Sequence, residues 1–358
     1  MDITVQNSDL LRELNLLEKV IGKKPTISVL SNVLIRAEMG GLSMAATDLE
    51  IGLISGCAAD VMEAGAITLP AKKLLDLVRA QSDTKVTMKS DAKGAVKFNS
   101  GGFQSRLQSL PAADFVGIPN GDGLTQYAIP RAPLKDAVAQ VRFAISDKDS
   151  RFYTKGAYVA FNEDSLLMAA TDSARLALTT FKRTGPMREA VLVPSKCLDE
   201  LSALLAEPGD GDVMFAQSDR HLFFDVDARL LISRQVDGKF PAYERIIPKN
   251  NTHKVTVSRL EFASVLKRLV LIHDIVALSL KAFTLDLSAA SAEVGDGVER
   301  LVVEYDGPDL NFKFQGQFIL DFLSAATGEK VTLSFQHADS PALFSDGEYI
   351  NVIMGMRL

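Results

Sequence analysis

The sequence contains very little cysteine and histidine. Its 358 residues include two cysteines, Cys57 and Cys197, which stand far apart in apolar surroundings. The four histidines occur singly, without the spacing of metal ligands, at His221, His253, His273 and His337. We therefore expect two small buried thiols, and neither a disulfide framework nor a bound metal or other cofactor.

Long apolar runs are also missing. No stretch of about 18 apolar residues predicts a membrane span, and residues 1–6 lack the basic start and apolar core of a signal peptide. These absences predict a cytoplasmic protein with no membrane partner. The net charge of −6 argues against a protein that coats DNA with its whole surface, although it permits a basic patch on an acidic body.

An internal repeat organises the chain. Residues 44–48, Met-Ala-Ala-Thr-Asp, recur unchanged at residues 168–172, and residues 67–72 resemble residues 191–196 at the same offset. Such self-similarity is typical of repeated domains. The repeat units open with apolar stripes of helical spacing, at Leu10, Leu14, Leu17 and Ile21, at Leu134, Val138, Val141 and Ile145, and at Phe262, Leu266, Leu269 and Ile272. A second helix of the third unit is predicted over residues 315–326.

The segments between the helices are alternating and β-branched. They predict strands over residues 33–37, 86–89, 157–161 and 222–226. The predicted fold class is therefore α+β with antiparallel sheets. Polar joints near residues 119–123 and 248–251 divide the chain into three domains, residues 1–121, 122–249 and 250–358. Judged against the repeat, about six residues are absent after Asp274, so either the third domain has a trimmed loop or the sequence omits residues there.

Basic residues recur on the predicted helices. Arg12 and Lys19 lie two turns apart on the first helix, as do Lys135 and Arg142 on its repeat, so each pair shares a helical face. Further basic residues near the helices are Lys23, Lys24, Lys72, Lys73, Arg79, Arg131, Lys196, Arg259, Lys267 and Arg268. Two interpretations stay open: ordinary solvated helix faces, or one positive surface that contacts phosphates without reading bases.

No group of residues forms a catalytic constellation. Asp48 and Asp172 occupy the same place in the repeat, and a residue that recurs in this way predicts a turn or a helix cap. Residues 209–212, Gly-Asp-Gly-Asp, lack the Lys-Ser/Thr of a phosphate-binding loop and the closing Glu of an EF-hand, and also predict a turn. The sequence therefore favours a binding protein over an enzyme.

Six segments in this order resemble the bacterial replicative clamp, the beta subunit of DNA polymerase III, over essentially the whole chain. They are residues 24–34, 46–52, 69–75, 110–115, 237–245 and 354–358. The resemblance implies a head-to-tail homodimer of three repeated clamp domains per chain, with helices lining the hole of the dimeric ring and sheets outside. It also implies a processivity factor that encircles double-stranded DNA without sequence specificity and has no exonuclease activity of its own.

The resemblance also assigns residues to sites. Lys24 and Lys148 match positions at which relatives touch duplex DNA. The seam between copies is assigned to Ser105 and Leu107 on one side and to Val270 and Leu271 on the other. A peptide-binding cleft between domains two and three is assigned to Thr154, Thr171, Ser173, Ala174, Arg175, Leu176, Pro241, Ile246, Gln315, Phe318, Ala342, Val352, Met354, Gly355, Met356 and Arg357.

Within this cleft, Met, Pro and aliphatic side chains are expected to adapt to apolar partners, and Arg175 or Arg357 to hold peptide carbonyl or carboxylate groups. The implied partners are the catalytic subunit of the replicative polymerase, an ATP-dependent clamp loader, and other polymerases and repair proteins that carry short linear motifs. These partners imply a location at the nucleoid. An alternative is a peptide-binding scaffold of clamp ancestry that no longer encircles DNA, because Ser105 replaces a large apolar residue of many relatives.

Overall fold

The computed structural model describes residues 1–22, 27–82, 84–91, 94–146, 151, 154–236, 238–337 and 340–356. The chain forms two compact units. The first contains residues Met1–Arg131 and Lys196–Gln235, and the second contains Ala132–Ser195 and Val236–Leu358. The predicted central domain, residues 122–249, therefore contributes to both units.

The first unit contains two antiparallel sheets, with strand orders β5-β1-β7-β8-β9 and β10-β6-β2-β3-β4-β18-β17-β16-β11. Its elements are β1 (Asp2–Gln6), α1 (Asn7–Val20), η1 (Ser28–Ser31), β2 (Asn32–Glu38), β3 (Gly41–Thr47), β4 (Ile51–Cys57), β5 (Ala59–Glu63), β6 (Gly65–Pro70), α2 (Ala71–Arg79), β7 (Lys85–Ser90), β8 (Ala95–Ser100), β9 (Phe103–Gln108), β10 (Leu110–Pro111), η2 (Ala112–Asp114), β11 (Tyr127–Ile129), α4 (Ser195–Ala206) from its second residue on, β16 (Val213–Gln217), β17 (His221–Val226) and β18 (Arg229–Arg234).

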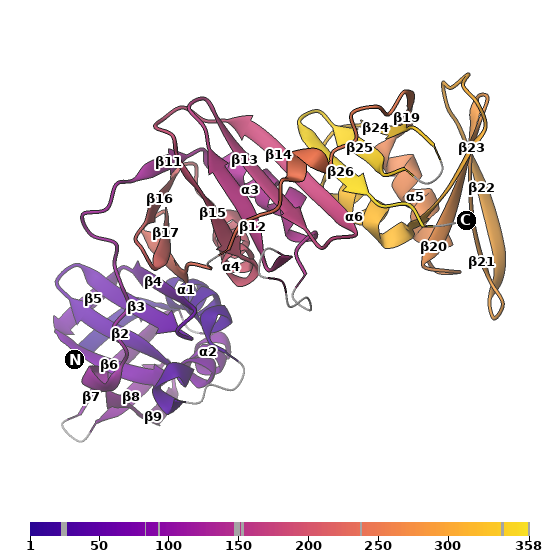
Figure 1. The fold of residues 1–358 in the computed structure, drawn as a ribbon. Coiled ribbons are helices and arrows are strands. Elements are labelled where there is room, and N and C mark those ends of the chain that lie inside the picture. Colours follow the sequence, from indigo (N-terminus) through magenta and orange to yellow (C-terminus); the bar gives the residue numbers. More distant parts are fainter. Residues whose placement is uncertain are drawn as a thin grey trace. The chain divides into compact units, whose positions relative to one another are not determined.

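The second unit also contains two antiparallel sheets, with orders β15-β12-β13-β14-β26-β25-β24-β19 and β22-β21-β20-β23. Its elements are α3 (Arg131–Arg142) from its second residue on, β12 (Gly156–Phe161), β13 (Ser165–Thr171), β14 (Arg175–Lys182), β15 (Arg188–Pro194), η4 (Tyr243–Arg245), β19 (His253–Ser258), α5 (Arg259–Leu269), β20 (Ile275–Lys281), β21 (Thr284–Ser291), β22 (Gly295–Val302), β23 (Leu310–Gln315), α6 (Gly316–Ala325), β24 (Lys330–Phe335), β25 (Ala342–Asp346) and β26 (Tyr349–Ile353). Figure 1 shows β24, β25 and β26 next to α6.

The structure confirms the predicted fold class and the predicted elements. The first three residues of each predicted stripe are buried on α1, α3 and α5, because side chains spaced by about one helical turn lie on one face. The fourth residues, Ile21, Ile145 and Ile272, lie past the ends of these helices, and Ile21 and Ile272 are only half-buried. The predicted strands lie within β2, β7, β12 and β17, and the second helix of the third domain is α6. Every strand pairing in the described residues is antiparallel.

One sheet in each unit runs through a predicted domain joint. In the first unit β4 pairs with β18, with Ile54 opposite Leu230. In the second unit β14 pairs with β26, with Leu176 opposite Val352. Because these ladders join strands of different predicted domains, the compact units follow the sheets and the strands of the central domain are divided between them.

A similar hydrogen bond recurs at the first residue of α1, α3 and α5. The first residue of α1, Asn7, donates from Nδ2 to the carbonyl of Gln81, just after α2, at 3.3 Å. Arg131 of α3 donates to the carbonyl of Glu207 at 2.7 Å, and Arg259 of α5 to the carbonyl of Gly328 at 2.7 Å. Each accepting residue lies one to three positions past the end of α2, α4 or α6, so the side chain binds the connection that follows that helix.

The connection after α5 is short. Residues 270–274 join α5 to β20, whereas residues 21–31 and 143–155 make the corresponding connections in the other two domains. The backbone N–H groups of Leu271, Ile272 and His273 all donate to carbonyls in the last turn of α5. These hydrogen bonds close the turn without further residues, which agrees with a trimmed loop in the third domain.

The two thiols differ in exposure. Cys197 is buried as expected, but Cys57 is only half-buried. Burial raises the pKa of Cys57 to about 11 and that of Cys197 to about 12. Within the described residues, no group of three or more His, Cys, Asp or Glu could hold a metal ion, and no helix is long and apolar enough to cross a membrane.

A buried ion pair fastens α1 to β18. The Glu13 side chain has no exposed surface and accepts hydrogen bonds from Arg229 at 2.6 and 2.8 Å and from Arg12 at 3.0 Å. Burial by itself raises the pKa of the Glu13 carboxyl, but the hydrogen bonds from Arg229 and Arg12 outweigh burial and hold this pKa below its usual 4.5.

We expect Glu13→Gln to lower the free energy of unfolding by about 2 kcal/mol at pH 7, because two guanidinium groups lose a charged acceptor. A depressed carboxyl pKa stabilises the fold above the usual pKa, and this stabilisation is lost as pH falls through the lowered pKa. The difference between wild type and Glu13→Gln in urea denaturation should therefore shrink below about pH 4.5. Glu38→Gln, at an exposed carboxylate, is the control, and a difference that does not depend on pH would contradict this role.

Candidate functional site

Two turns that begin with the same Thr-Asp pair follow β3 and β13. In the second turn, Thr171 Oγ1 donates to the carbonyl of Arg175 at 2.7 Å, and Asp172 Oδ1 accepts from the backbone N–H groups of Ala174 and Arg175 at 3.0 Å. Ser173 lies between them with φ of 77°. Thr47, Asp48 and Leu49 repeat this geometry after β3. The prediction that the repeated Thr-Asp pair forms a turn is therefore confirmed.

An apolar pocket of about 260 Å³ opens beside the second turn. Its floor contains Leu176 and Val352, which face each other across the β14–β26 ladder and are buried. Met354 continues β26 and donates its backbone N–H to Ala174 at 3.0 Å, which holds its half-exposed side chain at the rim. The pocket is lined by Arg151, Thr171, Ser173, Arg175, Leu176, Pro241, Ile246, Val352 and Met354.

The Arg175 guanidinium at this pocket is held by two carboxylates. Its Nε donates to Asp172 at 3.0 Å, its Nη1 to Asp321 of α6 at 2.6 Å and its Nη2 to the Phe143 carbonyl at 2.5 Å. The rings of Phe143 and Phe318 lie 4.8 and 4.2 Å from its central carbon. This arrangement favours a positioning role for Arg175 over the expected capture of a peptide carboxylate, because its charge is already balanced.

The remaining residues assigned to the cleft have different places. Thr154 and Ala342 are buried. Thr154 Oγ1 donates to the carbonyl of Arg151 at 2.7 Å, so Thr154 supports a residue of the pocket wall. Phe318 lies against Arg175. The pocket lining does not include Ala174, Gln315, Phe318, Gly355 or Met356, and Arg357 lies outside the described residues.

Sequence reasoning missed Arg151. It is an exposed residue that lines the pocket. A single Arg in a segment without periodicity looks like any solvated side chain, so only the folded backbone assigns it to the pocket.

The basic residues differ in exposure, and some exposed ones also bind other side chains, as Arg79 does when it donates to Asn15 at 2.8 Å. Lys19, Lys72, Lys73, Arg79, Lys135 and Lys267 are exposed on their helices. Arg12 binds Glu13 and Asp9, Lys196 binds Asp48, and Arg268 binds Glu299 and Ser264. Arg142 is half-buried, and Lys23, Lys24 and Lys148 lie outside the described residues.

The assignment of Arg131 to the DNA-facing surface is contradicted by the structure. Its side chain is 7% exposed and binds Asp227 and the carbonyls of Leu204 and Glu207. Arg259 has the equivalent place in α5, where it binds the carbonyls of Leu323 and Gly328. A sequence pattern cannot separate these arginines from surface ones, because both kinds occur at helix starts.

A buried carboxyl lies near the exposed Lys19. Burial raises the pKa of Glu200 on α4 to about 7, with Asp199 and Asp48 adding to this shift and Lys19 and Lys196 opposing it. This carboxyl therefore changes charge near neutral pH, beside basic residues that the sequence assigned to a DNA-facing surface.

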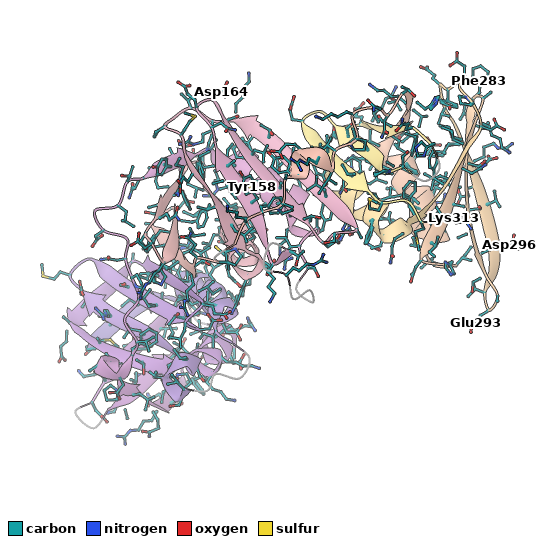
Figure 2. The ribbon with its side chains drawn as sticks, viewed as in Figure 1. Tyr158, Asp164, Phe283, Glu293, Asp296 and Lys313 are labelled. Carbon is teal, nitrogen blue, oxygen red and sulfur yellow. The ribbon has the colours of Figure 1, made fainter. Side chains whose placement is uncertain are left out.

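Of the residues assigned to the seam, two lie on an edge strand and two in the connection after α5. Ser105 and Leu107 belong to β9, the outer strand of its sheet, and both are half-buried. Val270 is half-buried at the end of α5, and Leu271 is 80% exposed. The outer strand β22 also exposes Val298 and Val302, which lie on the same face of the strand because they are four residues apart. In Figure 2, Glu293 and Asp296 mark one end of the β21–β22 hairpin.

We expect Asp321→Ala to lower the free energy of unfolding by about 2 kcal/mol, because a nearly buried guanidinium loses one of its two carboxylates. Urea denaturation measures this change. Gln317→Ala is the matched control, since Gln317 donates at 2.7 Å to the other oxygen of Asp321 from an exposed position, and it should change the free energy of unfolding by less than about 0.5 kcal/mol. Equal effects of the two variants would contradict the positioning role of the Arg175 ion pair.

Comparison with known proteins places all three domains in one family. Residues 1–119, 128–242 and 244–357 match the N-terminal, central and C-terminal domains of the DNA polymerase III beta subunit. The Beta sliding clamp of Pseudomonas aeruginosa is 31% identical over 370 residues, with 100% of both chains covered.

Solved structures agree over the full length. A DnaN sliding clamp from Pseudomonas aeruginosa bound to griselimycin has a TM-score of 0.94 and 30% identity, with 100% of both chains covered. A DNA polymerase sliding clamp from Bacillus subtilis has a TM-score of 0.94 and 26% identity, with 100% of this chain and 99% of that chain covered. The chain therefore belongs to the beta sliding clamp family, the beta subunits of DNA polymerase III.

Proposed function

We propose that this chain closes with a second copy into a ring around duplex DNA and tethers the replicative polymerase to it. It acts as a non-catalytic processivity factor at the nucleoid, with domains 1–121, 122–249 and 250–358. The observation that carries this proposal is the full-length agreement, at a TM-score of 0.94, with sliding clamps from two organisms. The pocket and the exposed lysines give the proposal its chemical basis.

The pocket suits short apolar peptide segments. Leu176, Pro241, Ile246, Val352 and Met354 supply an apolar lining, and Met adapts its shape to different side chains. Met354 is 46% exposed, so its burial by a ligand would remove apolar surface from water. The proposed ligands are segments of the polymerase catalytic subunit, the clamp loader and repair proteins.

The exposed lysines suit contact with phosphates. Lys19, Lys72, Lys73, Lys135 and Lys267 project from α1, α2, α3 and α5, and Lys binds phosphate as a flexible point charge. Phosphate contacts carry no base information, so these lysines can hold DNA without stopping at a sequence. This property is what a sliding ring requires.

The outer strands suit closure by a second copy. Strands β9 and β22 are at the edges of their sheets, and an edge presents backbone N–H and C=O groups that can pair with another chain. Val298 and Val302 add exposed apolar surface on β22, and Leu107 adds partly buried apolar surface on β9. Two different edges that meet head to tail form a closed ring when the rotation between copies closes after two subunits.

We expect Met354→Asp to weaken peptide binding at least tenfold, because a carboxylate at the apolar rim must lose water when the ligand binds. Fluorescence anisotropy with a labelled clamp-binding peptide of the polymerase catalytic subunit measures this affinity. Met187→Asp, at a methionine that is 66% exposed away from the pocket, is the control and should leave the affinity unchanged. A Met354→Asp variant that binds as tightly as wild type would refute the cleft assignment.

We expect the loaded protein to stay on nicked circular DNA and to leave when the circle is cut, because a closed ring is held by topology. The double variant Lys72→Glu and Lys73→Glu should reduce loading at least tenfold and leave the dimer intact, since charge reversal repels phosphate. Lys254→Glu with Lys330→Glu reverses two exposed charges on β19 and β24 as the control.

Leu107→Asp tests the seam in the same assay. A carboxylate in an apolar interface destabilises it, so this variant should sediment as a monomer and be lost from circles. Peptide binding with no retention on circular DNA by the wild-type protein would instead support a peptide-binding scaffold that does not encircle DNA.

A further inference from the structure

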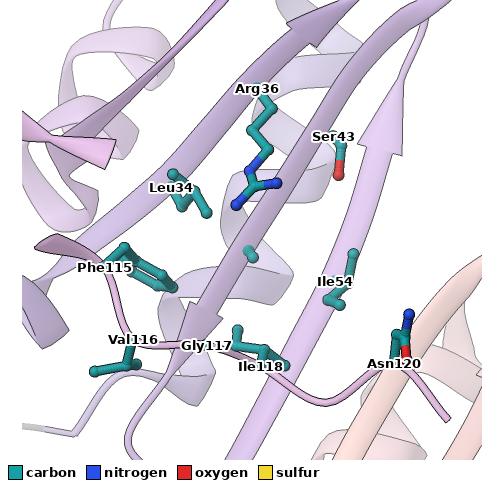
Figure 3. A pocket seen from close by; sticks show the side chains of 10 residues that line it. Leu34, Arg36, Ser43, Ile54, Phe115, Val116, Gly117, Ile118 and Asn120 are labelled. Carbon is teal, nitrogen blue, oxygen red and sulfur yellow. The ribbon is translucent and has the colours of Figure 1, made fainter. Parts of the chain in front are cut away.

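A second cavity, of about 320 Å³, lies on the sheet of the first unit. Leu34, Ala45 and Ile54, from β2, β3 and β4, form its floor, and the segment after η2 forms a wall (Figure 3). It is lined by Leu34, Arg36, Ser43, Ala45, Ile54, Phe115, Val116, Gly117, Ile118 and Asn120. No residue of the peptide pocket takes part in it.

The same place on the sheet of the second unit is occupied by protein. Leu34 pairs with Ala45, and Ala45 with Ile54, just as Tyr158 pairs with Ala169, and Ala169 with Leu178. The two sets therefore occupy equivalent positions on the repeated strands. Leu34 takes the place of Tyr158, which Figure 2 labels.

Three aromatic rings cover the second sheet at this place. The ring centres of Tyr158 and Phe240 are 5.2 Å apart, and Tyr243 lies 5.9 Å from Tyr158 and 6.2 Å from Phe240. Together they pack against the buried residues Ala169, Leu176, Leu178 and Val352.

The first sheet carries smaller residues at these positions. Residues 110–113, Leu-Pro-Ala-Ala, correspond to residues 240–243, Phe-Pro-Ala-Tyr, around the shared Pro-Ala pair. In this sequence match Leu110 and Ala113 stand opposite Phe240 and Tyr243, and on the paired strands Leu34 replaces Tyr158. On the first sheet one ring, that of Phe115, lines the cavity wall, and the smaller Leu34 in place of Tyr158 leaves space above the strands.

The rim of the first cavity carries one charge. Arg36, at the position of Ala160 in the repeat, is exposed, and Figure 3 shows its guanidinium reaching over the cavity between Leu34 and Ser43. The lining contains no carboxylate. An aromatic ring would fill the space, and Arg36 could stack on its face or bind an adjacent carboxylate.

We infer that this cavity binds an aromatic side chain of a partner protein that carries a carboxylate beside the ring. In the second unit, the aromatic side chains at this place are the protein's own Tyr158 and Phe240. In the first unit, the partner protein supplies the aromatic side chain. The inference rests on the cavity and the repeat, so it stands apart from peptide binding at Met354.

The probe is acetyl-Glu-(4-fluoro-Phe)-Glu-amide, titrated with the full-length protein and followed by fluorine NMR. Wild type should bind it in competition with acetyl-Glu-Phe-Glu-amide, and at least tenfold more tightly than acetyl-Glu-Leu-Glu-amide. Arg36→Ala should remove the preference for this probe over acetyl-Gln-(4-fluoro-Phe)-Gln-amide. The same variant should still bind the probe more tightly than acetyl-Glu-Leu-Glu-amide.

Filling the cavity with residues from the repeat tests its location. Leu34→Tyr and Ser43→Leu place in the cavity the residue types that the second repeat has at the equivalent positions, Tyr158 and Leu167. Each variant should weaken binding at least tenfold. Ser43 is exposed, so Ser43→Leu keeps the test valid if Leu34→Tyr fails to fold. Met354→Asp should leave probe binding unchanged. No binding by wild type, unchanged binding by Ser43→Leu, or loss of binding in Met354→Asp would each overturn the inference.

Discussion

Backbone pairing across the predicted domain joints is the constraint on which the rest of the structure depends. The β4–β18 and β14–β26 ladders make one sheet continuous in each unit. Their register sets Leu176 beside Val352 as the floor of the peptide pocket, and it sets Ile54 beside Leu230. A shift of one residue would turn these side chains to the opposite face, so the floor of the pocket is a consequence of strand register.

The repeated Thr-Asp turn contributes to local folding and to charge balance. One carboxylate oxygen of Asp48 or Asp172 accepts backbone hydrogen bonds that close the turn. The other oxygen binds Lys196 in the first case and Arg175 in the second. Because Arg175 also binds Asp321 of α6, the turn after β13 holds the pocket rim to a helix. The same short motif therefore has different partners in the two units.

The repeats differ in chemistry on the face of the sheet that carries Leu34 and Tyr158. The buried positions of the opposite face keep apolar residues, although their volumes differ, as between Ala37 and Phe161. Tyr158 and Leu34 occupy equivalent places, yet one belongs to a packed aromatic cluster and the other lines a cavity. Surfaces of one repeated fold have thus become chemically distinct without a change in backbone pairing.

The sequence by itself determined the repeated α+β organisation, because helical stripes such as Leu10, Leu14 and Leu17 and the recurring Thr-Asp turn are local signals. Family resemblance added much of the pocket, including Leu176 and Met354. Only the tertiary structure decided that Arg131 is buried, that Arg175 is bound by Asp321 and that Arg151 reaches the pocket. A charged side chain has the same local sequence pattern whether it faces water or a carboxylate. Arg175 and Asp321 are 146 positions apart, so only the folded sheet brings them together.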